Sequence, residues 1–362
     1  MEAQGVEVAV RAIVDQRTGV ASGNAFDMLS LAQLVERAVA LAHLAPQDPT
    51  LARLPAGTPA APAASAYVAA TAAATPEHRA RLCEPLFAAA EEGACWCAGY
   101  ASTSSFGITI ANTSGALSSF DGTDAAINAK MIASDSSGWA EAHATDVGTL
   151  DAASVARRAV EKAARGAAPC TVEPGAWSVI LEPAAFGEML AYLTGHFSAQ
   201  SYDEGSSFCS DGLDLAYFAE NVNMYDDWAH PLAPGMPFDY EGYPTQRLAL
   251  VDKGIVRNIV TDSRYAKKLA RENTGHALPA PNSYGPQPQH VVVAPGTQRV
   301  EELIASTQRG LLVTRFWYIR PVDQKKAIIT GMTRDGTFLI EDGRITSGVR
   351  NMRFNQSIIE AL

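Results

Sequence analysis

Two side chains capable of acid–base chemistry, Tyr192 and His196, stand four residues apart near the middle of the chain. They follow an apolar strand pattern over Trp177–Leu181 and the pair Glu182-Pro183, which predicts a helix running to Gly195. Side chains four residues apart on a helix share a face, so a metal-free catalytic site is one hypothesis. The alternative is structural: Tyr192 packs against its neighbours, and a protonated His196 at the helix end gains about 0.3–1 kcal/mol from the helix dipole.

Other candidate residues lie further along the chain. His276 closes the tripeptide Thr274-Gly275-His276 at the end of an expected helix from Thr261 to Gly275, where it faces a cleft or caps a turn. A polar segment over residues 198–237 also holds possible metal ligands, namely Asp203, Glu204, Asp226, Asp227 and His230. Their spacing matches no metal-site pattern, so we interpret the segment as a solvated acidic loop of the kind that forms lids and substrate walls.

Composition excludes several classes of partner. The 362 residues hold 28 Lys+Arg and 39 Asp+Glu, and the net charge of −11 repels nucleic acid and anionic lipid. No apolar run is long enough to span a bilayer, and the first residues lack a signal-peptide pattern, so we expect a cytoplasmic protein. The odd number of cysteines favours free thiols over a disulfide framework or metal ligation: Cys83, Cys95, Cys97, Cys170 and Cys209.

The first half of the chain predicts a small strand–helix unit, a linker and an α+β domain. Alternation over Gly5–Val14 fits a strand, and a capping pattern at Ser30 begins a helix that ends near His43. Ala45–Ala66 is rich in Ala and Pro, as linkers are. The central domain is expected to contain a helix from Thr75-Pro76 to Gly93, strands over Cys95–Ala116 and Lys130–Ser134, and an amphipathic helix over Asp151–Arg165.

The second half predicts mainly antiparallel strands. Leu311–Phe354 contains three or four in a row, with hairpin turns at Asp335-Gly336 and Asp342-Gly343 and a turn at Arg320–Asp323. We therefore expect an α+β fold, with a mixed α/β amino-terminal part and a carboxy-terminal antiparallel sheet with packed helices. The predicted domains are residues 1–66, including the linker, a central α+β domain at 67–170, and a β-rich domain at 171–362 that carries the cleft.

Three segments make the chain recognisable: GLLVTRF from Gly310, TGMTRDGTFLIEDG from Thr330 and NMRFNQSIIEAL from Asn351. They resemble the carboxy-terminal domain of the TldD/PmbA (TldE) family, and the resemblance extends back to about Val6. It implies a peptidase-related protein that dimerises around an internal cleft. It also implies that the amino-terminal domain is incomplete, and that Phe238–Gly242 is a structural D-x-E-G element.

Some relatives in this family hold zinc on an HExxxH helix, where two histidines bind the ion and the glutamate activates water. Aligned without gaps, the same positions here read Ala191-Tyr192-Leu193-Thr194-Gly195-His196, so only the last histidine remains. The resemblance therefore implies a degraded zinc site. No cofactor is expected, and zinc is the family alternative.

Two classes of function follow. In the first, the protein is a peptidase-type hydrolase that takes an extended peptide as an added strand beside Leu311–Tyr318. Arg315, Phe316, Trp317 and Tyr318 would line that groove. In the second, it is a non-catalytic relative, either a scaffold that binds peptides or a subunit paired with a zinc-bearing TldD-like partner. A repurposed metal-free enzyme in the same cleft is a further alternative, and a homodimer or a heterodimer is expected in every case.

Overall fold

The computed structural model describes residues 3–57 and 66–362, and these residues form an α+β fold, as predicted. Separate hydrophobic cores follow one another along the chain: a small one around Leu34, a second around Ile127 and a third around Phe197. Within the described residues, no helix is both long and apolar enough to cross a membrane. The predicted linker over Ala45–Ala66 falls partly on residues 58–65, which lie outside the described structure.

The amino-terminal unit is a β-hairpin covered by one helix. It consists of β1 (Val8–Val14), β2 (Arg17–Gly23) and α1 (Met28–Leu44). The helix cap differs from the prediction, because Asp27 rather than Ser30 is the N-cap, and its carboxylate accepts hydrogen bonds from the backbone N–H and the hydroxyl of Ser30. The hairpin contacts the carboxy-terminal domain through Arg11, whose Nη1 lies 2.8 Å from Glu241 Oε1.

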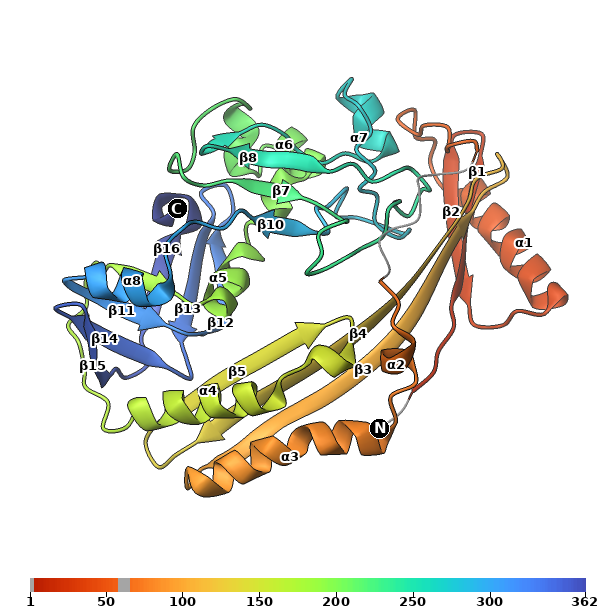
Figure 1. The fold of residues 1–362 in the computed structure, drawn as a ribbon. Coiled ribbons are helices and arrows are strands. Elements are labelled where there is room, and N and C mark those ends of the chain that lie inside the picture. Colours follow the sequence, from red (N-terminus) through yellow and green to blue (C-terminus); the bar gives the residue numbers. More distant parts are fainter. Residues whose placement is uncertain (1–2, 58–65) are drawn as a thin grey trace.

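The central unit is a three-stranded antiparallel sheet with two long helices on one face (Figure 1). Both helices begin where the sequence predicts, at the N-caps Thr75 and Asp151. The short strand predicted over Lys130–Ser134 is instead the end of a 16-residue strand, whose many Ala, Ser and Asp residues hide its alternation. The elements are α2 (Ala69–Ala72), α3 (Pro76–Glu92), β3 (Trp96–Ala111), β4 (Leu117–Ile132), β5 (Ser137–Ala144), η1 (Val147–Thr149) and α4 (Ala152–Arg165).

The carboxy-terminal domain begins with β6 and contains short helices around several sheets. Its elements are β6 (Val179–Leu181), α5 (Pro183–Leu190), η2 (Thr194–Phe197), α6 (Ala199–Asp203), η3 (Phe208–Asp211), β7 (Met224–Asp226), β8 (Leu248–Asp252), β9 (Ile255–Val256), α7 (Ser263–Lys268), β10 (Val291–Val293), α8 (Val300–Ser306), β11 (Arg309–Val313), β12 (Phe316–Asp323), β13 (Ile328–Thr333), β14 (Thr337–Glu341), β15 (Arg344–Gly348), β16 (Arg353–Ser357) and α9 (Ile358–Ala361).

The strands predicted in a row over Leu311–Phe354 divide between two sheets. One sheet has the order β15-β14-β11-β6, in which β6 runs parallel to β11, and the other has the order β12-β13-β16. The predicted turn at Arg320–Asp323 is wrong, because these residues continue β12 through two irregularities in its register with β13. The Asp342-Gly343 hairpin between β14 and β15 is confirmed. The predicted hairpin at Asp335-Gly336 is wrong, because this turn joins β13 and β14, which belong to different sheets. Asp335 and Asp342 both adopt positive φ.

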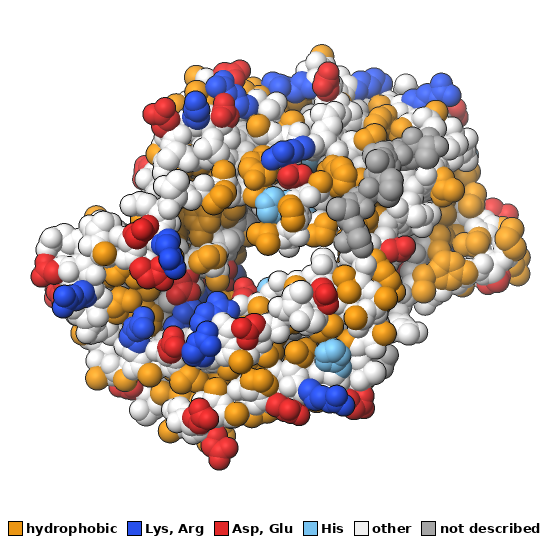
Figure 2. Space-filling view, viewed as in Figure 1, with side chains coloured by type: hydrophobic (Ala, Val, Ile, Leu, Met, Phe, Trp, Pro, Cys, Tyr) orange, Lys and Arg blue, Asp and Glu red, His pale blue; other side chains and the backbone are white. Residues whose placement is uncertain are grey.

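The three units surround an opening, which the space-filling view shows between the layer that holds β7 and β8 and the layer that holds β5 (Figure 2). The long β3–β4 hairpin reaches from the carboxy-terminal domain to the amino-terminal hairpin (Figure 1). Lys and Arg side chains gather beside the opening, over the junction of α4 and the carboxy-terminal domain (Figure 2). The central unit and the carboxy-terminal domain, which both border the opening, therefore meet at this junction.

Close packing of α4 on the central sheet gives a first prediction. A Cβ atom on Gly138 of β5 would lie 2.1 Å from the carbonyl oxygen of Ala159 and 2.5 Å from the backbone nitrogen of Ala163. Backbone atoms cannot rotate away, so we expect Gly138→Ala to lower the free energy of unfolding by at least about 2 kcal/mol in urea denaturation. The control is Gly187→Ala in α5, where nothing lies within 4 Å. It should be neutral or stabilise by up to about 1 kcal/mol, and equal effects of both changes would refute the packing argument.

Candidate functional site

Tyr192 does not share a helical face with His196. Helix α5 ends at Leu190, and a 3-10 turn over Thr194–Phe197 follows, since Thr and Gly are weak helix formers and two side chains after the helix are buried in the core. The Tyr192 hydroxyl donates a 2.8 Å hydrogen bond to the carbonyl oxygen of Ile319 in β12. This hydroxyl therefore holds a strand of the carboxy-terminal sheet.

His196 is buried, with 5% of its surface exposed. Its Nδ1 accepts a long hydrogen bond of 3.4 Å from the backbone N–H of Phe208, and its ring centroid lies 5.3 Å from that of Phe208. Burial lowers the pKa of His196 to about 4, so the imidazole is neutral at pH 7. The expectation of a protonated histidine stabilised by a helix end is therefore wrong, because the ring faces the apolar core.

The proposed peptide groove has no open strand edge along β11. Strand β11 lies between β14 and β6, so both of its edges are occupied. In β12, two backbone groups are also taken: Glu188 Oε2 accepts a 2.7 Å hydrogen bond from the N–H of Phe316, and the Tyr192 hydroxyl donates to the carbonyl of Ile319. Burial raises the pKa of Glu188, although its contacts with Phe316 and Arg315 act in the opposite direction and lower it in part. Addition of a peptide strand is therefore disfavoured beside both segments.

The four predicted groove residues have different environments. Phe316 is buried, whereas Trp317 and Tyr318 are 47% and 56% exposed. The guanidinium of Arg315 stacks 4.3 Å from the ring centroid of Trp139, and its Nε lies 3.2 Å from Glu188 Oε1. Only the two exposed aromatic side chains are therefore free to contact a ligand without rearrangement.

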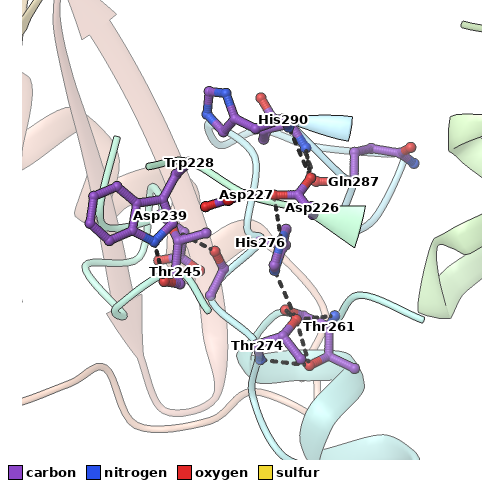
Figure 3. Close-up of polar contacts among 12 residues, drawn as sticks. Asp226, Asp227, Trp228, Asp239, Thr245, Thr261, Thr274, His276, Gln287 and His290 are labelled. Carbon is purple, nitrogen blue, oxygen red and sulfur yellow. Dashed lines mark hydrogen bonds and ion pairs between the residues drawn. The ribbon is translucent and has the colours of Figure 1, made fainter. Parts of the chain in front are cut away.

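His276 lies in a buried polar network that joins β7 to the loop after α7 (Figure 3). Its Nδ1 is 2.9 Å from Thr274 Oγ1, and its Nε2 is 3.4 Å from Asp226 Oδ1, which is long for a hydrogen bond. Within the described residues, neither Nε2 nor Oδ1 has a hydrogen-bond partner of its own. With 1% of its surface exposed, His276 holds β7 in place and does not line an open surface, contrary to the expectation of a cleft residue.

Asp226 anchors this network from the opposite side. Its Oδ2 accepts hydrogen bonds of 2.7 and 2.9 Å from the backbone N–H groups of Gln289 and His290. Burial alone would raise the pKa of Asp226, but His276 and the N–H of His290 outweigh it and hold that pKa below its ordinary value. Burial lowers the pKa of the neighbouring His290 imidazole. The pattern in the sequence gave no sign of this pairing, because Asp226 and His276 are fifty residues apart.

The segment interpreted as a solvated acidic loop is only partly so. Asp226 and Asp227 are buried, and Asp227 Oδ2 lies 3.2 Å from Arg247 Nε. Asp203 forms an ion pair with Lys268 of α7. The solvated-loop interpretation is therefore wrong for Asp226 and Asp227, whose buried carboxylates are held by partners far away in the sequence.

The D-x-E-G element, Phe238–Gly242, connects the amino-terminal hairpin to the carboxy-terminal domain. Asp239 accepts 2.9 Å hydrogen bonds from the backbone N–H groups of Glu241, Tyr243 and Ala277. Burial, together with the charge of Glu241, raises the pKa of Asp239 to about 7. Glu241 binds Arg11 and also accepts a hydrogen bond from the N–H of Ser263. These contacts give the element a structural role, as the sequence resemblance implied.

Another buried carboxylate, Asp335, lies where the central sheet meets the carboxy-terminal domain. Its Oδ1 is 2.6 Å from Lys130 Nζ of β4 and accepts a 2.7 Å hydrogen bond from Ser137 Oγ of β5. Arg315 and Arg334 lie 3.7 and 3.8 Å from its Oδ2. A cavity of about 390 Å³ adjoins it, lined in part by Ser134, Ser136, Arg350 and Asn351. Sequence reasoning missed this residue, because its Asp-Gly dipeptide was interpreted only as a turn.

Residues 174–362 match the family model described as the PmbA/TldA metallopeptidase C-terminal domain, and this match covers more than half of the chain. The chain belongs to the PmbA/TldD family. The prediction from the three sequence segments is thereby confirmed. Membership is carried by the domain that holds the buried networks around His276 and Asp335.

Individual relatives agree with this assignment to the PmbA/TldD family. A metalloprotease TldD homolog of Buchnera aphidicola is 24% identical over 192 residues, which are 52% of this chain and 39% of that protein. An uncharacterised protein of Methanocaldococcus jannaschii is 29% identical over 102 residues, covering 28% of this chain and 24% of that protein. The matches thus span about a quarter to two fifths of these relatives.

The fold is shared with a solved structure that has the same family name. The crystal structure of TldE from Thermococcus kodakarensis superposes with a TM-score of 0.87 at 21% sequence identity. The superposition covers 98% of this chain and 82% of TldE. At this level of identity the comparison establishes the common fold, while partners and chemistry have to be argued from the residues of this chain.

The residues of this PmbA/TldD chain do not fit the zinc site of an HExxxH helix. Ala191 offers no donor atom, the Tyr192 hydroxyl is bonded to Ile319, and the His196 ring is bonded to Phe208 inside the core. Within residues 3–57 and 66–362, no group of three or more His, Cys, Asp or Glu side chains is arranged to hold a metal ion. No chemical step through zinc is therefore derived for this chain.

The buried imidazole predicts a specific pH dependence of stability. The pKa of His196 is about 4 in the folded protein and about 6.5 once the chain unfolds, so the unfolded chain binds more protons between these values, and stability falls as pH falls. We expect wild type to lose on the order of 2 kcal/mol more than His196→Gln between about pH 7 and pH 4.5 in urea titrations. The control is His78→Gln at an exposed position, which should not change how the free energy of unfolding varies with pH. The burial argument would be contradicted if His196→Gln showed the same pH dependence as wild type.

The junction carboxylate predicts a large loss of stability. Asp335→Ala leaves Lys130 without its carboxylate partner at a buried site and removes a carboxylate close to Arg315 and Arg334, so we expect a loss of about 3 kcal/mol in the free energy of unfolding. The matched control is Asp211→Ala, which removes an exposed ion pair with Lys325 and should cost less than about 1 kcal/mol. Both free energies of unfolding are measured by urea denaturation. Similar losses in the two variants would show that the buried contacts of Asp335 stabilise the protein no more than an exposed ion pair does.

Proposed function

We propose that this protein is a non-catalytic, peptide-binding member of the PmbA/TldD family. One observation carries the proposal: Tyr192 and His196, at the positions of the zinc-binding helix of relatives, are both engaged in internal contacts. The hydroxyl that could act as an acid or base secures β12 instead, and the imidazole is a neutral core residue. The scaffold is thus retained while the groups expected to do chemistry stabilise it.

Peptide binding is supported by exposed aromatic–arginine pairs on β12. The guanidinium of Arg334 lies 4.3 Å from the ring centroid of Trp317, and that of Arg320 lies 4.4 Å from Tyr318. Each pair offers an apolar face beside a positive charge, which suits apolar side chains and carboxylates of an extended chain. In this proposal the peptide is held by side chains and not by strand addition. Arg315 and Phe316 support the binding surface, and His276 is outside it.

The proposal also includes a second subunit. Relatives of this chain are called TldD and TldE, so a pair with a TldD-like subunit and a pair of identical subunits are the two arrangements to consider. In the first, zinc chemistry comes from the partner, and this chain contributes peptide contacts. The cytoplasmic location and a repurposed metal-free activity stay predictions from the sequence.

The proposal is tested with the purified full chain. We expect less than stoichiometric zinc by elemental analysis, no cleavage of fluorescein-labelled casein peptides, and binding of those peptides by fluorescence anisotropy. Trp317→Ala with Tyr318→Ala should weaken binding about tenfold, as loss of interface aromatic residues does. Tyr284→Ala removes an aromatic side chain that is 74% exposed elsewhere and should have no effect.

Two outcomes would overturn this function. The first is one zinc ion per chain together with peptide cleavage that is lost in His196→Ala. The second is peptide affinity that is unchanged by the Trp317 and Tyr318 substitutions, or reduced equally by Tyr284→Ala.

A further inference from the structure

The cavity of about 390 Å³ beside Asp335 lies between the central unit and the carboxy-terminal domain. Its walls come from segments far apart in the sequence: the tip of the β4–β5 hairpin, the residues after α4, the turn between β13 and β14, and the residues after β15. Backbone hydrogen bonds join these segments, from the N–H of Arg350 to the carbonyl of Cys170 at 2.9 Å and from the N–H of Val349 to that of Thr337 at 2.8 Å. Small-molecule sites have volumes of about 300–1,000 Å³, so the cavity is large enough to be one.

Two residues that line the cavity carry buried oxygens without a partner. Asp335 and Thr337 are 2% and 3% exposed, and within the described residues neither Asp335 Oδ2 nor Thr337 Oγ1 makes a hydrogen bond. Unpaired buried oxygens are unfavourable, and native proteins normally provide them with partners. Because an ionised carboxylate can only accept, the group that satisfies Asp335 has to be an N–H or O–H donor.

The charges around Asp335 select the kind of donor. Lys130 Nζ lies 2.6 Å from its Oδ1. Arg315 and Arg334 lie 3.7 and 3.8 Å from its Oδ2, and Lys and Arg side chains gather at this junction (Figure 2). A cationic group of a ligand would be placed among these like charges, which is unfavourable. The donor that fits is therefore uncharged, as a peptide N–H or a hydroxyl is.

The exposed side of the cavity offers donors for an anion. Arg350 and Asn351 are exposed, and within residues 3–57 and 66–362 neither side chain has an ion pair or a hydrogen bond. A guanidinium suits a carboxylate, because two of its N–H groups can bind both carboxylate oxygens. Asp135 also lines the cavity, and its Oδ2 accepts a 2.9 Å hydrogen bond from the N–H of Ala168. The cavity thus combines an acceptor for a neutral donor with a cation for a carboxylate.

We propose that this cavity binds the carboxy-terminal residue of a peptide. In such a residue a neutral N–H and a carboxylate are attached to the same Cα atom, so one small cavity can bind both. The N–H donates to Asp335 Oδ2, and the carboxylate binds the guanidinium of Arg350 and accepts from the Thr337 hydroxyl. Capture of a terminal carboxylate is a recurrent mode of peptide recognition. Apolar residues of the wall are available to the terminal side chain: Ile132, Pro169 and Val349.

This inference rests on the proposed function in one respect, namely that the ligand is a peptide. Arg334 connects the cavity to the surface proposed for peptide binding. Its guanidinium lies 4.3 Å from the ring centroid of Trp317, and its Nε lies 3.8 Å from Asp335 Oδ2. A peptide whose last residue occupies the cavity can therefore extend toward Trp317 with the residues that precede it.

The first test compares two forms of one peptide on the full chain. The probe is a pentapeptide ending in valine, labelled with fluorescein at its amino terminus, as the free acid and as the carboxy-terminal amide. By fluorescence anisotropy, the amide should bind at least about tenfold more weakly, because it lacks the charged partner of Arg350. Arg350→Ala should weaken the free acid to the same extent and leave the amide unchanged. The control is Arg37→Ala, which removes an exposed arginine of α1 and should change neither affinity.

The outcomes separate this inference from the proposed function. Equal affinities of acid and amide, or equal effects of Arg350→Ala and Arg37→Ala, would overturn the cavity as a site for peptide termini, whatever Trp317→Ala with Tyr318→Ala does. Binding of the acid that depends on Arg350 but not on Trp317 and Tyr318 would support the cavity and contradict the proposed surface. Displacement of the peptide by lactate or inorganic phosphate at lower concentrations than by the unlabelled peptide would show a site for small anions instead.

The second test addresses the buried wall of the cavity. Thr337→Val keeps the shape of the side chain and removes the unpaired hydroxyl. We expect it to weaken binding of the free acid about fivefold or more, while the free energy of unfolding in urea stays the same or rises, since no bond within the chain is lost. Unchanged affinity for the free acid, or a loss of stability in the absence of peptide, would overturn the role of this hydroxyl in binding.

Discussion

The ion pair between Asp335 and Lys130 is the contact on which the arrangement of the domains depends. A carboxylate that is 2% exposed is held at 2.6 Å from an ammonium group of a different domain, with Ser137 donating to the same oxygen. A buried charge is stable only with such partners, so the turn between β13 and β14 must lie against the ends of β4 and β5. That position brings Arg315 over Trp139 and next to Glu188. The junction thus extends from the central sheet through Arg315 to the start of β12.

Helix α5 and the turn after it hold strand β12 in place. Glu188 and Tyr192 bind the N–H of Phe316 and the carbonyl of Ile319, which are groups that an incoming strand would need. Helix α5 and the turn after it therefore occupy part of a strand edge in this chain. Of the two strands considered for recognition, β11 is paired on both sides, and β12 has two of its backbone groups bonded to Glu188 and Tyr192. Strand addition is thus disfavoured at both, whereas the aromatic side chains Trp317 and Tyr318 of β12 are exposed.

Local sequence signals predicted the elements whose cause is local. Thr75-Pro76 and Asp151 cap helices as expected, because a side-chain oxygen accepts a bond from an N–H three residues away. The turn at Asp342-Gly343 is a hairpin between β14 and β15 because these residues tolerate positive φ. Prediction failed where distant contacts decide. Helix α5 stops at Leu190 so that Leu193 and Phe197 can enter the core, and Arg320–Asp323 stays in a strand because β13 pairs with it.

The sequence by itself determined the family, the α+β class and the loss of two of the three HExxxH positions, because these depend only on which residue types follow one another. It could not reveal that His196 is neutral, that Asp226 faces His276 or that Asp335 joins two domains. These properties arise from burial and from contacts between residues far apart in the chain, and a low dielectric changes the charge that a side chain can carry. Which strand edges are free is likewise decided only after all strands have found their neighbours.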